Sequence, residues 1–189
     1  MKLKHVIGLI TSLLLLFMLA GCADVPQQDI DDANAALNAA KQAEADKYVP
    51  DQYNAAKKSL DNAMAMVEEE KGSMFSNYDE AIQALQAAKQ AANSAAEAVP
   101  AKKEEIKGEV ENLLAQIPEV VKQTKTAWKK APRGKGTREP LQMIKQDIEN
   151  TEASVSEVNA ALEQGDLLGA RQKAQEIISK LQRLQSELQ

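Results

Sequence analysis

The stretch YDEAIQALQAAKQAANSAAEAV, residues 78–99, decides the fold of this chain. Its apolar residues recur in alternating steps of three and four, at Tyr78, Ala81, Leu85, Ala88, Ala92, Ala95 and Val99. This spacing places them on one face of an α-helix, as in helices that pack side by side with slight supercoiling. Alanine, glutamine, glutamate and lysine, which all favour helices, fill most of the other positions. The stretch therefore predicts a long amphipathic helix.

Apolar seams with the same spacing run through the rest of the chain, which has almost no stretch alternating at the period of a strand. The seams comprise Ile30, Ala33, Leu37 and Ala40; Tyr53, Ala56, Leu60, Ala63 and Val67; Ile106, Val110, Leu113, Ile117 and Val120; Leu141, Ile144, Ile148, Thr151, Val155, Val158 and Leu162; and Leu167, Ala170, Ala174, Ile177, Leu181, Leu184 and Leu188. We therefore expect an all-α fold of elongated antiparallel helical hairpins, packed like a coiled-coil bundle.

Proline and small polar residues separate the predicted helices. We expect Pro50 to end the first helix, Asp51 to begin the second, and Asn77 to cap the third. Proline removes a backbone donor and clashes with the preceding turn, so Pro100 should start a new helix or kink this one, and Pro118 should kink its helix.

These breakers divide the chain into six ranges. The first two are a lipoprotein signal peptide at 1–21 and a lipidated N-terminus at 22–50, which includes the first helix at 28–46. An Ala-rich hairpin at 51–98 and a kinked connecting helix at 99–130 follow. The last two are a basic loop at 131–138 and a C-terminal hairpin at 139–189, which has a tight turn at 164–166. The sequences of the two hairpins align coarsely. An internal duplication and the general similarity of all heptad hairpins explain this alignment equally well. The second hairpin buries larger side chains and is expected to be the more stable half.

The first 21 residues have the order of a bacterial export signal: a basic start, an apolar run, and small residues at a cleavage site. The apolar run from Val6 to Ala20 is shorter than the roughly 20 residues that a membrane-spanning helix needs. A cleaved signal therefore explains the segment better than a transmembrane anchor does.

Leu19, Ala20, Gly21 and Cys22, which follow the apolar run, resemble the lipobox of bacterial lipoproteins. The resemblance implies that the Cys22 thiol receives a diacylglyceryl group and that cleavage leaves Cys22 as the first residue. It is the only cysteine, so an intramolecular disulfide is excluded. In enteric bacteria an aspartate directly after the lipidated cysteine favours the inner membrane, so Ala23 indicates the outer membrane, facing the periplasm.

The amino-acid composition excludes several classes of function. Without residues 1–21 the chain has 21 basic and 28 acidic side chains, a formal net charge of −7, which disfavours nucleic-acid binding. The only histidine, His5, is lost with the signal. Triads, cysteine nucleophiles and ordinary zinc sites therefore lack their residues, and we expect no enzyme, metal or cofactor. The runs Glu68–Glu70 and Glu104–Glu105 leave carboxylate chemistry formally open, although solvated charge explains them better.

A basic segment stands out in this acidic protein. From Val120 to Arg138 there is no acidic residue, and the segment contains Lys122, Lys125, Trp128, Lys129, Lys130, Arg133, Lys135 and Arg138. It is a candidate contact for lipid phosphates, lipopolysaccharide or an acidic partner. The alternative is that the cations complement the end of a helix and that Trp128 packs against a neighbouring helix. The nearby Gly-Lys pair lacks the rest of a nucleotide-binding loop.

The segment from residue 45 to 98 resembles a bacterial domain of unknown function. The similar positions are Ala45–Pro50, then Tyr53, Ala56, Leu60, Asn77–Ala81 and Ala88. That domain usually follows a lipobox and sometimes precedes an OmpA-like peptidoglycan-binding domain. The resemblance implies a helical hairpin in the cell envelope and brings no catalytic residues. No OmpA-like segment is recognisable here, so direct cell-wall binding is not expected.

Together these features predict a non-enzymatic envelope lipoprotein. Its acylated Cys22 would hold it on the lipid bilayer, and its helical body would serve as a periplasmic scaffold or a docking surface for an unidentified protein or envelope polymer. The alternative is a helical module that binds a small apolar or anionic envelope ligand. Intramolecular hairpins satisfy most seams, so we expect a monomer.

Overall fold

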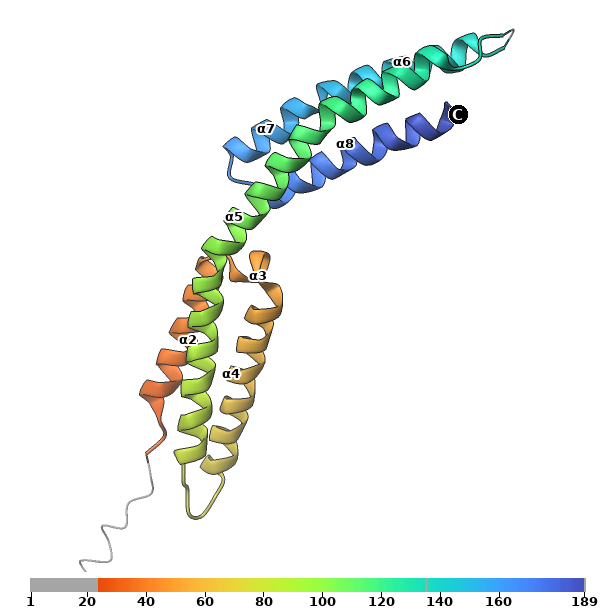
Figure 1. Cartoon of the computed structure of the whole chain (residues 1–189). Coiled ribbons are helices and arrows are strands. Elements are labelled where there is room, and N and C mark those ends of the chain that lie inside the picture. The colour runs from red at the N-terminus through yellow and green to blue at the C-terminus, as the bar shows by residue number, and fades with distance from the viewer. Residues whose placement is uncertain (1–23, 135, 189) are drawn as a thin grey trace, which may run out of the picture. The chain divides into compact units, whose positions relative to one another are not determined.

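The computed structural model describes residues 24–134 and 136–188. In it the chain forms two helical units (Figure 1). Unit 1 ends at Val99 and unit 2 begins at Pro100. One helix, α5 (Asp79–Lys130), contributes its first part to unit 1 and its second part to unit 2. Within the described ranges no residue lies in a strand. The prediction of an all-α helical fold is confirmed.

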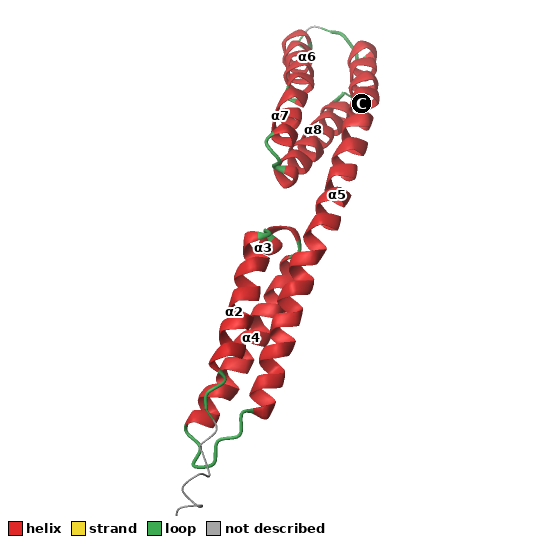
Figure 2. Cartoon of the chain, turned by 90° about the vertical axis from the view of Figure 1, so that its left-hand side faces the viewer, coloured by secondary structure: helices red, strands yellow, loops and turns green. Residues whose placement is uncertain are grey.

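Unit 1 is a bundle of three long helices with one short helix at a corner (Figure 2). They are α2 (Gln27–Gln42), α3 (Ala45–Tyr48), α4 (Pro50–Lys71) and the first part of α5. The helix expected at 28–46 thus ends earlier, because Glu44 adopts a left-handed backbone (φ 67°). Asp51 does not cap α4, which begins at Pro50, the first helical position that proline favours.

The core of unit 1 follows the predicted seams. All seven seam positions of residues 78–99 are buried, and in α4 the alanine, leucine and valine positions are buried while Tyr53 is half-buried. Near the α4–α5 loop the core contains Ile30, Leu60, Val67, Tyr78 and Leu85. Farther along, three alanines from three helices meet, so the helix axes can approach closely there.

Helix α5 passes through both of its prolines without interruption. No new helix begins at Pro100, and the range 99–130 is more than a connector because its second part packs within unit 2. Both prolines are exposed, and each removes the backbone N–H that would have donated to the carbonyl oxygen four residues earlier, at Ala96 and Leu114. Val99 is buried in unit 1, and Ile106 is buried in unit 2.

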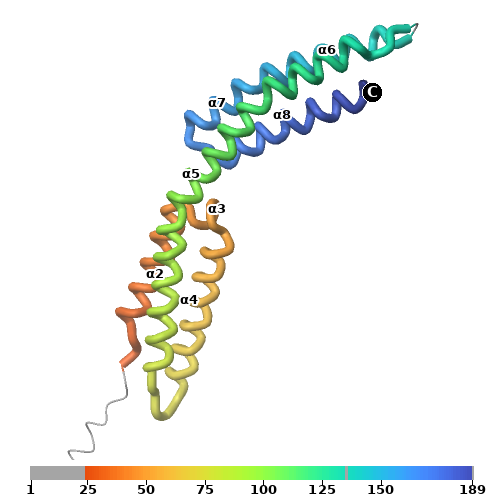
Figure 3. Tube along the Cα trace, in the orientation of Figure 1, coloured from red at the N-terminus to blue at the C-terminus, as the bar shows by residue number. Residues whose placement is uncertain are grey.

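Unit 2 packs the second part of α5 with α6 (Arg138–Ala153), α7 (Val155–Glu163) and α8 (Leu167–Glu187). Helices α6 and α7 replace the single helix expected before the last turn, and they follow one another along α8 (Figure 3). The break falls where the hydroxyls of Thr151, Ser154 and Ser156 donate hydrogen bonds to carbonyls of the preceding turn. Such bonds compete with the helical ladder and bend helices.

The predicted tight turn joins α7 to α8. Gly165 adopts a left-handed backbone (φ 77°), which glycine tolerates without strain. Asp166 then caps α8 by accepting a hydrogen bond from the Gly169 backbone N–H at 3.0 Å.

Removing this cap gives a test of unit 2. We expect Asp166→Ala to lower the free energy of unfolding by about 1 kcal/mol, because the amide at the start of α8 loses its acceptor. Urea denaturation followed by the fluorescence of Trp128, the only tryptophan, measures the change. Asp166→Asn is the matched control, since asparagine caps as well as aspartate does. Equal losses in both variants would contradict the capping role.

An exposed ion pair also joins α7 to α8, and it predicts a pH dependence. Lys173 Nζ lies 2.7 Å from Glu157 Oε2. The hydrogen bond and then the charge of the partner lower the pKa of Glu157 below 4.5 and raise the pKa of Lys173 above 10.5. The carboxylate contribution is therefore complete above the pKa of unfolded Glu157 and is lost as pH falls through the lowered folded pKa.

We accordingly expect wild type to exceed Glu157→Gln slightly in stability at pH 7. This difference should fade as pH falls below 4.5 and should shrink in high salt, because the pair is exposed. Denaturation of both proteins at neutral and acidic pH measures it. Glu163→Gln, an exposed carboxylate at the end of α7, is the control. A difference that grows toward low pH would contradict the assigned pair.

Candidate functional site

The candidate site lies where the end of α5 meets the start of α6, on either side of the basic loop. The indole Nε1–H of Trp128 donates a hydrogen bond to the carbonyl oxygen of Leu141 at 2.7 Å. This bond fixes the ring against α6, as the packing alternative for Trp128 anticipated. The guanidinium carbon of Arg133 lies 5.1 Å from the centre of the indole ring, within the range of a cation–π contact.

The loop that carries Arg133 is closed by its own hydrogen bonds. The backbone N–H of Gly134 donates to Thr137 Oγ1 at 2.7 Å, and the same hydroxyl lies 3.1 Å from the Gly134 carbonyl oxygen. Thr137 is therefore engaged with the loop and makes no side-chain cap for α6. The loop holds Arg133 on the indole and brings Arg138 to the first turn of α6.

These residues surround a solvent-open pocket of about 510 Å³. Its lining is Trp128, Arg133, Gly134, Thr137, Arg138, Leu141, Gln142 and Lys145. The lining therefore combines an indole and a leucine with two guanidinium groups and one ammonium group, and it contains no carboxylate. Such a pocket suits a ligand that has both an anionic group and an apolar part.

Solvent exposure limits what each charge contributes. Arg133, Arg138 and Lys145 are all exposed, and Lys145 also lies 3.4 Å from Glu149 on the same helix. An exposed ion pair contributes between about 0 and 1 kcal/mol, so one cation alone would hold an anion weakly. Several cations acting together with the apolar surface of Trp128 and Leu141 are needed for useful affinity.

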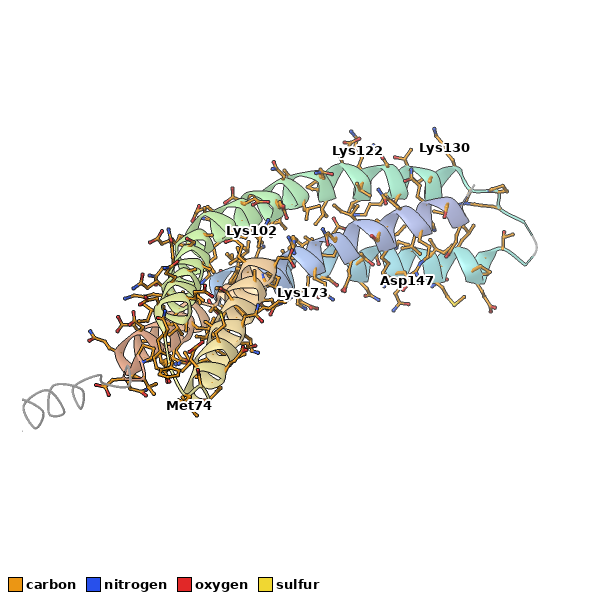
Figure 4. All side chains as sticks on the ribbon, turned by 90° about the horizontal axis from the view of Figure 1, so that it is seen from below. Met74, Lys102, Lys122, Lys130, Asp147 and Lys173 are labelled. Atoms are coloured by element: carbon orange, nitrogen blue, oxygen red, sulfur yellow. The ribbon has the colours of Figure 1, made fainter. Side chains whose placement is uncertain are left out.

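The predicted basic residues that the structure describes are spread over different surfaces, and some are paired with carboxylates. Lys122 lies 3.6 Å from Glu119, and Lys125 is paired with Glu152 of α6. Lys129 is exposed, and Figure 4 shows Lys122 and Lys130 on the side of α5 that faces away from α6 and α8. Among the predicted residues that the structure describes, Trp128, Arg133 and Arg138 line the pocket and the others do not.

Sequence reasoning missed the contribution of α6, namely Leu141, Gln142 and Lys145. Arg138, Leu141 and Lys145 recur at steps of three and four, so they share one face of α6. Extending the basic segment along that face would have found them. The lipobox residues Leu19, Ala20, Gly21 and Cys22, as well as Lys135 of the basic segment, lie outside the described residues.

In 24–134 and 136–188 there is no group of three or more histidine, cysteine or acidic residues placed to hold a metal ion. None of the helices in these ranges combines the length and the apolar character that crossing a membrane requires.

Comparison with known proteins supports the resemblance noted for unit 1. No curated protein and no solved structure matches this sequence. One family model matches residues 28–108, which include most of α2, all of α3 and α4, and the start of α5. The description of this family is Domain of unknown function (DUF4398), and the segments that carry the resemblance lie inside the matched residues.

Proposed function

We propose that this protein is a lipid-anchored helical scaffold of the bacterial envelope, without enzymatic activity. The observation that carries the proposal is the short distance along the chain between anchor and body: α2 begins at Gln27, five residues after Cys22. A lipid on Cys22 would thus hold unit 1 directly at the bilayer. Two or more acyl chains give stable anchoring, whereas one gives marginal binding.

The helical surfaces support a role in docking. Both units place their apolar seams inside and present charged faces, on which ion pairs such as Lys57–Asp61 and Lys102–Glu105 are exposed. Isolated pairs of this kind contribute little to stability. They leave broad polar helix faces that a protein or an envelope polymer can contact, and Ala23 after the lipidated cysteine favours the outer membrane.

Lipid attachment is tested by expressing the full chain in an enteric bacterium. Wild type should incorporate labelled palmitate and float with membranes in a density gradient, whereas Cys22→Ser should lose label and remain soluble. Ala23→Ser is the matched control and should behave like wild type. Ala23→Asp should move the protein toward the inner-membrane fraction. Wild type that carries no label and does not float would refute the anchor.

The scaffold role is tested separately by proximity cross-linking from exposed helix positions in the native envelope. Cross-links from one helix face to one protein or polymer would support docking. Labels spread evenly over all faces and many neighbours would contradict it.

A second candidate function rests on the pocket beside Trp128. Its mixed lining supports binding of an anionic amphiphile, meaning a phosphate or carboxylate head joined to an alkyl chain. The cations would hold the head, and the indole and Leu141 would contact the chain.

Trp128 makes this second candidate measurable, because its fluorescence reports on the pocket. Below its micelle concentration, dodecyl phosphate should shift the emission, and neutral dodecyl maltoside should not. The double variant Arg133→Ser/Arg138→Ser should weaken binding at least tenfold, a change that corresponds to about 1.4 kcal/mol. Lys122→Ser, on the outer side of α5, is the control. Equal binding in the double variant and the control would contradict a role for the pocket.

A further inference from the structure

The loop between α4 and α5 presents two large apolar side chains to solvent. Met74 is 87% exposed and Phe75 is 88% exposed, the highest values among the large hydrophobic residues that the structure describes. Scattered apolar residues on a surface need no explanation. Here, however, the two are adjacent and project from the tip of a hairpin, where Figure 4 shows Met74 at the end of the unit.

Hydrogen bonds give this loop a defined shape. The Ser76 hydroxyl donates to the Glu70 carbonyl oxygen at 2.9 Å, and the backbone N–H of Asn77 donates to the Glu70 carboxylate at 2.8 Å. At the start of α5, Asn77 Oδ1 accepts from the Asp79 N–H at 3.0 Å, the cap expected from the sequence. The loop is therefore tied to both helices while its two apolar side chains point outward.

The N-terminal end of the described chain lies at the same end of unit 1 as this loop (Figures 1 and 2). Val25 packs against the core cluster that contains Val67 and Tyr78, which flank the loop in sequence. Cys22 precedes Asp24 by two residues, and two extended residues reach at most about 7 Å. The chain length would therefore keep the proposed lipid on Cys22 near the end of unit 1 that carries Met74 and Phe75.

We propose that Met74 and Phe75 insert into the phospholipid interface beside the lipid on Cys22 and give unit 1 a second contact with the membrane. This inference rests on the proposed lipid anchor. The anchor keeps the loop close to the bilayer, so a small apolar contact forms at a high effective concentration. Two contacts with the membrane, the lipid on Cys22 and the apolar loop, together limit rotation of unit 1 about its anchor.

Charge around the loop selects the kind of surface. Glu68, Glu69, Asp79 and Glu80 flank the loop, and the single cation between residues 68 and 80, Lys71, is paired with Glu68. Anionic lipids attract basic segments and repel acidic ones. The loop therefore fits a zwitterionic interface, such as one of phosphatidylcholine or phosphatidylethanolamine, and not a strongly anionic one.

Fluorescence quenching tests the contact in the full lipidated chain. A Phe75→Trp reporter in a Trp128→Phe background, reconstituted by its lipid into phosphatidylcholine vesicles, carries a single indole at the loop. We expect blue-shifted emission and at least threefold quenching when the acyl chains are brominated. The matched control is Gln52→Trp in the same background, because Gln52 is exposed and lies about 30 Å away along α4 at 1.5 Å per residue. It should show no quenching.

The outcomes separate the two proposals. Met74→Ser added to the Phe75 reporter should reduce quenching at least twofold, which supports a shared insertion. Vesicle flotation without quenching of the Phe75 reporter, or with equal quenching of both reporters, would overturn the inference and leave the anchor intact. Protein that receives no lipid and does not float would overturn the anchor, and the inference with it.

Discussion

Leu181→Ala is expected to lower the free energy of unfolding of unit 2 by about 2–5 kcal/mol. Leu181 has no exposed surface, and it belongs to the buried seam of α8 with Ile177 and Leu184. Its backbone carbonyl also faces α5, where the buried Thr124 hydroxyl lies 3.4 Å from it. Truncation removes apolar contact and leaves a cavity that the neighbouring helices fill only in part, so both effects destabilise the unit.

Urea denaturation followed by circular dichroism and by Trp128 fluorescence measures this loss. The matched control is Gln182→Ala, the next residue along α8, whose side chain is exposed and whose replacement should change stability by less than about 0.5 kcal/mol. A loss below about 1 kcal/mol for Leu181→Ala with an unchanged denaturant slope would mean that the seam does not form a packed core.

The sequence predicted the interior of unit 1 well because one pattern dominates it. Every seam residue from Tyr78 to Val99 is buried, since the heptad spacing repeats without error and alanine places no conflicting demand on the helix. The turn at Gly165 was also predictable, because a glycine between two periodic segments usually marks a left-handed backbone. Local chemistry was sufficient in both places.

The second part of α5 shows where periodicity loses accuracy. The predicted seam included Leu113 and Val120, which are half-buried, whereas Val121 and Thr124 are buried. A straight helix drifts relative to a seven-residue repeat, so the buried face moves by one position. Thr124 tolerates burial because its hydroxyl donates to the Val120 carbonyl oxygen at 2.8 Å. A polar residue at that position gave no signal in the sequence.

The helix breaks were predicted only in part. Pro100 was expected to start a new helix or to kink this one, and no new helix begins there, because the effect of a proline depends on which face of the helix it occupies and on how the flanking turns pack. The kinks expected at Pro100 and Pro118 stay predictions. Ser154 was not expected to interrupt a helix, yet its hydroxyl donates to the Asn150 carbonyl oxygen at 3.0 Å beside two similar bonds. Both outcomes depend on tertiary packing and on several side-chain hydrogen bonds acting together, and the helix propensity of a single residue includes neither effect.

The sequence predicted the pocket residues of the basic segment but not those farther along α6. Trp128 and Arg133 stood out because they lie in a run of basic residues without acidic neighbours. The contribution of Lys145, and the pairing of Lys125 with Glu152, depend on how α6 lies against α5. The charge pattern of the sequence therefore predicted more unpaired basic side chains than the structure has, and it missed the pocket residues that α6 contributes.

Ala92→Leu is expected to destabilise unit 1 by about 1–3 kcal/mol, in spite of the greater hydrophobicity of leucine. Ala92 meets Ala36 and Ala56, and the exposed fractions of Ala92 and Ala56 are 1% and 0%. Each of these alanines comes from a different helix, and the larger side chain that packs against the cluster, Leu37, is only half-buried at its edge. Three additional carbon atoms must separate the helices or adopt a strained rotamer.

Ala87→Leu is the matched control for this variant, because Ala87 is exposed on the same helix and leucine is nearly as good a helix former as alanine. Thermal and urea denaturation should therefore separate the two variants, with loss of stability in Ala92→Leu and little change in Ala87→Leu. Equal or increased stability in Ala92→Leu would show that the alanine layer contains free volume. Close helix approach would then not be the reason for alanine at these positions.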